Sequence, residues 1–242
     1  KILAERHVVS GEVLPTYIDD DERLALAWAM RNAAIAAWGG TPSDVVVAAE
    51  ALSKLRAGAE AATRSETLKE IGAITEWVHG IAALTRGKMT DAVTHLDRAS
   101  NEFETLGQPV HAAHAQVPKI IALAVLGQHE LATTSGLATR HQLLELGEWH
   151  AAAKVSNNLG NLYCQSGQYT DALPYFVSAQ ELFESLGDHD NAIASSIGLA
   201  EVYSSVGDFD AALLVYEEAI TKAKHHQLPM RQGIAIEAIA LV

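Results

Sequence analysis

Glycine recurs along this chain with a fixed spacing of 40 residues, and this regularity limits the fold more than any other feature of the sequence. Two series are interleaved at an offset of 20 residues: Gly87, Gly127, Gly167 and Gly207, and Gly107, Gly147 and Gly187, with Gln227 at the next position of the second series. Glycine adopts the left-handed backbone conformation that commonly ends a helix, because it has no Cβ to clash. The spacing therefore predicts two helices of about 16–18 residues in every repeat.

Between the glycines, the apolar residues have helical spacing. Leu159, Leu162 and Tyr163 stand at positions i, i+3 and i+4, and the same pattern returns 40 residues later. Alanine occupies one position of every repeat: Ala92, Ala132, Ala172 and Ala212. A methyl side chain lets two helices approach closely, and stacked hairpins bury the apolar faces that a single hairpin leaves exposed. The sequence thus predicts an all-α solenoid.

The best-formed repeat resembles the tetratricopeptide repeat family. The residues that carry this resemblance are Asn158-Leu159-Gly160-Asn161-Leu162-Tyr163, Gly167-Gln168-Tyr169, Ala172, Phe176 and Ala179. The next repeat is similar, and the resemblance extends over residues 68–242. It implies a right-handed superhelical α-solenoid of stacked antiparallel helix hairpins. The 40-residue period is similar to the long-helix variety found in bacterial regulatory and signalling proteins and in animal scaffolds that hold extended peptides.

The repeats predict two regions. An array occupies residues 66–242, with hairpins at about 68–107, 108–147, 148–187 and 188–227 and the first helix of a further repeat at 229–242. Residues 1–65 form a divergent helical hairpin or cap, with one helix from Asp19 to Trp38 and a second that starts at Pro42 and ends near Ala62. Residues 1–18 add part of another helix. Because apolar side chains of 229–242 would be exposed, we expect a longer parent protein.

Charge and cysteine content exclude several kinds of partner. With 30 acidic and 17 basic residues, the chain has a net charge of −13, which opposes binding to nucleic acid or to an anionic membrane surface. Cys164 is the only cysteine, so no intramolecular disulfide can form, and a reducing, cytoplasmic location is expected. No apolar run reaches the roughly 18 residues that a membrane span requires. The partner is therefore expected to be a protein or a peptide.

The sequence contains no motif that predicts catalysis or a cofactor. Phosphate loops, dinucleotide fingerprints and zinc-protease motifs are missing, and no acid, base and nucleophile can be named together. His111 and His114 share a helical face at i, i+3, but the spacing supplies no further metal ligands, and we interpret them as surface or interface histidines. We interpret His225-His226 as a cation at a helix end. We therefore expect neither an enzyme nor a metal or cofactor site.

The resemblance also implies a binding surface, because the first helix of each tetratricopeptide hairpin usually lines a concave face that holds a peptide. Transferred onto this chain, the family pattern places ten residues on or near that face: Lys154, Asn157, Asn158, Asn161, Gln165, Glu201, Ser204, Ser205, Trp77 and His114. An asparagine amide both donates and accepts hydrogen bonds, which suits Asn158 and Asn161 to a peptide backbone. The alternative is that these are ordinary polar residues on an exposed helix face. A basic clamp for a C-terminal carboxylate is not evident.

Two functions remain open from the sequence. The first is a protein- or peptide-binding scaffold that forms the interaction or regulatory region of a larger multidomain protein. The second is a self-association module of a bacterial signalling protein whose catalytic or DNA-binding output domain lies outside these residues. A binding groove predicts asparagines in register on a polar face, whereas self-association predicts an apolar patch on the helix at 229–242.

Overall fold

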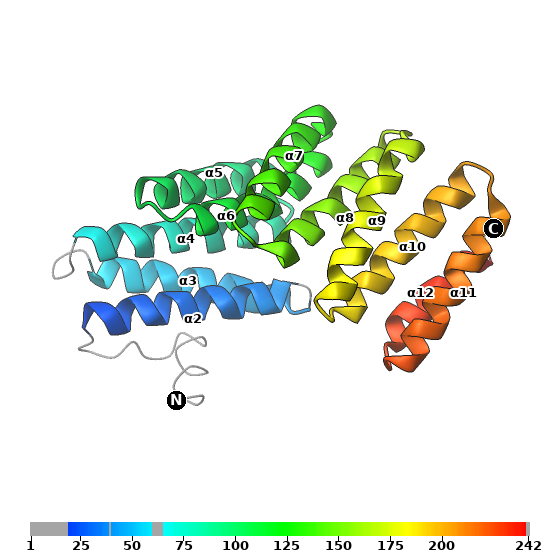
Figure 1. The fold of residues 1–242 in the computed structure, drawn as a ribbon. Coiled ribbons are helices and arrows are strands. Elements are labelled where there is room, and N and C mark those ends of the chain that lie inside the picture. Colours follow the sequence, from blue (N-terminus) through cyan, green and yellow to red (C-terminus); the bar gives the residue numbers. More distant parts are fainter. Residues whose placement is uncertain (1–18, 39, 60–64, 241–242) are drawn as a thin grey trace. The chain divides into compact units, whose positions relative to one another are not determined.

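The computed structural model describes residues 19–38, 40–59 and 65–240, and the chain divides into two compact units, residues 1–127 and 128–242. The first unit contains α2 (Asp20–Trp38), α3 (Pro42–Ala59), α4 (Ser65–Thr85), α5 (Met89–Thr105) and α6 (Pro109–Val125) (Figure 1). The second contains α7 (His129–Glu145), α8 (Trp149–Gln165), α9 (Tyr169–Ser185), α10 (His189–Ser205), α11 (Phe209–His225) and α12 (Pro229–Ile239). No strand occurs within the described ranges, and the predicted all-α repeat fold is confirmed.

The repeated glycines end helices in the left-handed conformation, as predicted. Their φ angles lie between 67° and 84° at all seven positions. At Gly167, the backbone N–H donates to the Cys164 carbonyl, and the N–H of Gln168 donates to the Tyr163 carbonyl, both at 2.9 Å. These bonds satisfy carbonyl groups that a helix end would otherwise leave unpaired. The helices α5 to α11 are consequently all 17 residues long.

The N-terminal helices start where the sequence predicts them, within one residue. α2 begins at Asp20, and α3 begins at Pro42, whose fixed φ suits the first turn of a helix. α3 is described to Ala59, and its predicted end near Ala62 falls among residues 60–64, outside the described part of the chain. The helix predicted within residues 1–18 also falls outside it.

One continuous hydrophobic core joins the five helices of the first unit. Its members include Met30 of α2, Leu52 of α3, Ile74 of α4, Leu96 of α5 and Ala112 of α6. Burial of these side chains is the main favourable term that holds the helices together. Since α2 and α3 pack into the same core as α4, the domain boundary between residues 65 and 66 stays a prediction.

Alternate helices of the second unit lie next to one another. α8 contacts α10, and α10 contacts α12. The helix between α8 and α10 in the sequence, α9, contacts both of them. The close contacts use alanine: Ala172 of α9 and Ala212 of α11 are both 0% exposed, as their repeat position predicts. The fold therefore brings the first helices of successive hairpins, α8 and α10, side by side.

Candidate functional site

The predicted residues of α8 form one polar stripe on the helix surface. Lys154, Asn158, Asn161 and Gln165 follow one another at steps of four, three and four residues, which keeps them on the same side of an α-helix. Lys154, Asn161 and Gln165 are exposed, and Asn158 is half-buried. We call these four residues the α8 surface.

Asn157, which neighbours the α8 surface, is partly engaged within the fold. The buried Ser195 hydroxyl of α10 donates to the Asn157 Oδ1 at 3.0 Å and also lies 3.1 Å from the Asn191 carbonyl. A buried hydroxyl needs such partners, because leaving it unpaired costs about 1–3 kcal/mol. Asn157 therefore fixes α10 beside α8, and its amide NH₂ group remains the part that could face a ligand.

The predicted residues of α10 place a carboxylate beside α8. Partial burial raises the pKa of the Glu201 carboxyl. Burial, and then the charge of Glu201, raises the pKa of the Cys164 thiol on α8, and the same two causes raise the pKa of Tyr216 on α11 to about 12. Glu201 is therefore electrostatically close to both helices, and Cys164 is not an activated thiolate.

The serines predicted at the end of α10 differ in their freedom to bind. Ser204 is half-buried and Ser205 is exposed, but the Ser205 hydroxyl donates to the Glu201 carbonyl at 2.8 Å within its own helix. Such local bonds occupy the single donor of a serine. Of the three predicted α10 residues, only Glu201 thus offers a charged group, a carboxylate, to a ligand.

Trp77, which the family pattern places on or near the binding face, has a buried side chain. Its side chain is 2% exposed, with the Phe103 ring at 5.9 Å and the Arg31 guanidinium 3.9 Å above its ring. The reason is that α4 turns its polar Glu76 toward α5, where His95 Nδ1 lies 2.8 Å from the Glu76 carboxylate, and α2 covers Trp77. Trp77 is a core residue of the first unit.

The histidines predicted near the binding face or as minor metal candidates lie in an aromatic cluster of the first unit. His114 is half-buried, and its ring centre lies 6.4 Å from that of Trp77. His111 lies 4.4 Å from the ring of Trp28 and 5.4 Å from that of Phe103. Among the described residues, no group of three or more histidine, cysteine or acidic side chains is placed to hold a metal ion.

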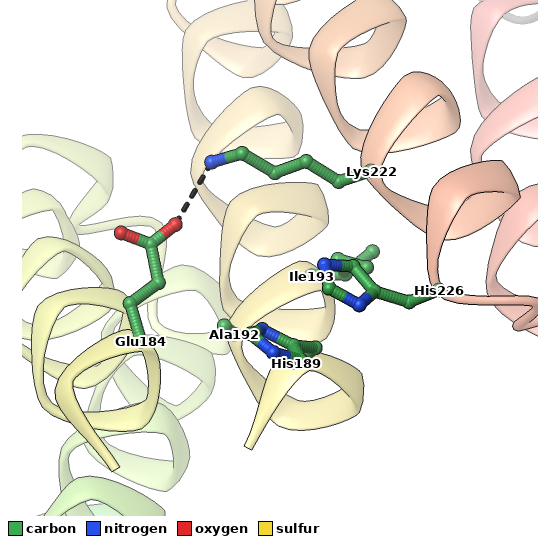
Figure 2. A pocket seen from close by; sticks show the side chains of 6 residues that line it. All are labelled: Glu184, His189, Ala192, Ile193, Lys222 and His226. Carbon is green, nitrogen blue, oxygen red and sulfur yellow. Dashed lines mark hydrogen bonds and ion pairs between the residues drawn. The ribbon is translucent and has the colours of Figure 1, made fainter. Parts of the chain in front are cut away.

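One pocket of the second unit was not predicted from the sequence. It has a volume of about 310 Å³ and is lined by residues of α9, α10 and α11 and of the turn after α11: Glu184, His189, Ala192, Ile193, Lys222 and His226 (Figure 2). His226 follows the last turn of α11, where the helix-end histidines were expected, but its partner His189 carried no signal in the sequence.

None of the described helices combines the length and the apolar character that crossing a bilayer would require.

Comparison with known proteins identifies the repeats. Residues 151–224, less than half of the chain, match the model of the tetratricopeptide repeat family. No curated protein matches the chain.

Solved structures of three proteins have a similar fold. A Rap protein complexed with competence and sporulation factor is 16% identical, with a TM-score of 0.66 over 87% of this chain and 57% of that one. The Rap conjugation gene regulator of plasmid pLS20, in complex with the Phr peptide, is 18% identical, with a TM-score of 0.69 over 99% and 67%. A signal transduction ATPase with a tetratricopeptide repeat sensor, from Pyrococcus horikoshii, is 17% identical, with a TM-score of 0.68 over 88% and 33%.

Proposed function

We propose that this tetratricopeptide chain is a protein- or peptide-binding scaffold and that a peptide segment binds at the α8 surface. The observation that carries the proposal is the pair of amide side chains at Asn158 and Asn161, about one helical turn apart on a helix that lies beside α10. An amide offers a donor and an acceptor, so two of them in this arrangement can hold the main chain of an extended peptide.

Charge favours a basic peptide as the partner. The chain carries a net charge of −13, and Glu201 places a carboxylate beside the α8 surface. Complementary charge accelerates encounter and selects against acidic segments more than it adds affinity. The peptides named in the two Rap complexes support a peptide as ligand, at a level of identity that establishes only a shared fold.

We further propose that the chain is the interaction region of a larger cytoplasmic regulatory or signalling protein, with no catalytic activity or cofactor of its own. The Pyrococcus horikoshii ATPase, which uses such repeats as its sensor, supports this arrangement. No nucleic acid or membrane partner is proposed, because the acidic charge opposes both.

A second candidate function, self-association, is favoured by one observation on α12. This helix exposes three apolar side chains, Met230 at 75%, Ile236 at 50% and Ile234 at 38%. Apolar side chains gathered on one element are typical of protein interfaces. Analytical ultracentrifugation of the wild type and of Ile236→Asp tests it, since a concentration-dependent oligomer that the substitution abolishes would favour this function.

The peptide-binding proposal is tested with ligands selected from a random peptide library and measured by fluorescence anisotropy. Each lost hydrogen bond costs about 0.5–1.5 kcal/mol, so the double variant Asn158→Ala/Asn161→Ala is expected to raise Kd roughly 5–150-fold. The matched control, Thr170→Ala/Glu181→Ala, removes exposed polar groups of α9 and should leave Kd unchanged. Equal Kd values for the wild type and the Asn158/Asn161 variant would contradict the assigned site.

A further inference from the structure

Two histidines stack face to face in the pocket of the second unit. The rings of His189, at the start of α10, and His226, just after α11, have centres 3.7 Å apart and planes inclined by 19°. His225 meets His226 edge-on at 4.9 Å. Figure 2 shows His226 near Ile193 and His189 near Ala192, with the Glu184–Lys222 pair at the left and top of the view. Contact this close is favourable for neutral imidazoles and unfavourable once both carry a charge.

The stack lies at the joint between α11 and α12. It joins the first residue of α10 to the residue that follows α11, at the open end of this hairpin. α12 begins three residues after His226. Gln227 between them has a φ of 57°, a left-handed conformation that costs a residue with a side chain about 1–2 kcal/mol. Arg231 of α12 holds the Asp190 carboxylate of α10 with two bonds of 2.9 and 2.8 Å. The Arg231–Asp190 ion pair thus holds the start of α12 against α10, and a strained turn at Gln227 leads into this helix.

The acidic groups around the stack already have partners. On α9, Glu184 lies 2.8 Å from Lys222, which also contacts Glu218 of α11 at 2.8 Å. At the start of α10, Asp188 pairs with His150 at 2.7 Å and caps Asn191, and Asp190 pairs with Arg231. The remaining titratable neighbours on or next to this segment are cationic or become so on protonation: Lys224 and His225.

A proton added to His226 would therefore meet positive charge, whereas the Glu184 carboxylate, which interacts with His189, is already paired with Lys222. Burial, and then the charges of His189 and His225, hold the pKa of His226 below its ordinary value. A histidine with a lowered pKa stabilises the closed state above the ordinary histidine pKa of about 6.5, and this stabilisation is lost as the pH falls below it.

We propose that the His189–His226 stack is a proton-sensitive latch that holds the turn leading from α11 into α12 against the start of α10. In the closed state the rings are stacked and α12 is docked. On acidification His226 takes up a proton, its charged ring separates from His189, the left-handed turn at Gln227 relaxes, and α12 opens more often. The opening equilibrium depends on how far the pKa of His226 is lower in the closed state than in the open state. At acidic pH, each unit of this difference multiplies the equilibrium constant for opening by up to tenfold.

Hydrogen exchange of the backbone amides in α12, expressed as protection factors at pH 7.5 and 5.5, tests the latch. In the wild type we expect protection of α12 to fall about threefold or more relative to that of α9 in the same molecule. In His189→Phe/His226→Phe, which keeps two stacked rings but removes the titration, the ratio should stay constant. The control His141→Phe changes an exposed histidine of α7 and should behave as the wild type.

The same fall in the wild type and the double phenylalanine variant, or no fall in the wild type, would overturn the latch. A second measurement keeps the test decisive if the double variant folds poorly. An NMR titration of the wild-type imidazole protons should give His226 a pKa below about 6.5. A value at or above that would also refute the proposal.

Discussion

Substitution of Gly198 by alanine is expected to destabilise the second unit, although alanine is the better helix former. The Phe176 ring of α9 lies between two glycines, Gly160 of α8 and Gly198 of α10. A Cβ atom at residue 198 would lie 2.5 Å from Phe176 Cε1, and one at residue 160 would lie 2.8 Å from Cε2 and Cζ. Carbon atoms pack best at about 3.5–4.0 Å, and the Phe176 ring, which is 1% exposed, could move away from residue 198 only toward Gly160.

Two opposing terms set the magnitude of the effect. Alanine at residue 198 gains about 1 kcal/mol in helix propensity over glycine, and overpacking against Phe176 costs about 1–3 kcal/mol. We expect Gly198→Ala to lose about 1 kcal/mol of the free energy of unfolding. Because the ring would relax toward Gly160, the double variant Gly160→Ala/Gly198→Ala should lose about 1 kcal/mol more than the sum of the single losses.

Urea denaturation followed by circular dichroism measures these free energies, with Gly233→Ala as the matched control. Gly233 also lies within a helix, but a Cβ there would meet nothing within 4 Å, so alanine should stabilise by about 0.4–1 kcal/mol. Adding Phe176→Leu should recover part of the loss caused by Gly198→Ala. The packing argument fails if Gly198→Ala stabilises the protein as much as Gly233→Ala does.

Four further substitutions test helix packing, a strained backbone position and a partly buried charge, each by urea denaturation. Ala172→Leu and Ala212→Leu insert bulk at fully buried contacts and should each cost about 1–3 kcal/mol, and an unchanged stability would show that the helices are not in close contact there. Gln227→Gly should stabilise by about 1 kcal/mol by relieving the positive φ, whereas a loss of stability would mean that the side chain matters more. Burial, and then the Glu76 charge, raises the pKa of Glu102, so its contribution to stability is full below pH 4.5 and falls as the pH rises through the folded-state pKa. Glu102→Gln should therefore be more stable than the wild type at pH 7, with a smaller difference at pH 4.5, and the opposite order would refute this reading.

The sequence was sufficient to predict where the helices end, because one residue type decides it locally. A left-handed residue after the last turn is a backbone requirement, and glycine meets it at Gly87 and at each later position of the two series. The less regular hairpin has no such marker at its far end, and its predicted end near Ala62 stays a prediction because it lies outside the described residues. Helix ends set by tertiary contacts leave a weaker pattern in the sequence.

The candidate surface was predictable only in part. The α8 stripe follows from helical periodicity, since Lys154, Asn158, Asn161 and Gln165 share one face whatever the neighbours are. Trp77 of α4 has the register of Asn157, which neighbours this stripe, yet α2 covers Trp77, and periodicity within one helix carries no information about what packs on it. A site residue can thus be placed on a face from the sequence, but its exposure depends on the neighbouring helices.

Several contacts between successive repeats join residues whose spacing differs from the 40-residue period of the sequence. In the second unit four of them join residues 38 apart, namely Arg140 with Ser178, His150 with Asp188, Asn157 with Ser195, and Glu184 with Lys222, whereas Asp190 and Arg231 are 41 apart. An offset two short of the period means that each helix is displaced along its neighbour by about half a turn. For these four pairs, adding 38 to the number of the first residue gives the residue that it contacts in the next repeat. Asn157 pairs with a hydroxyl because residue 195 is serine, and a Ser195→Ala variant should release the Asn157 amide to the peptide-binding face without disturbing Asn158 or Asn161.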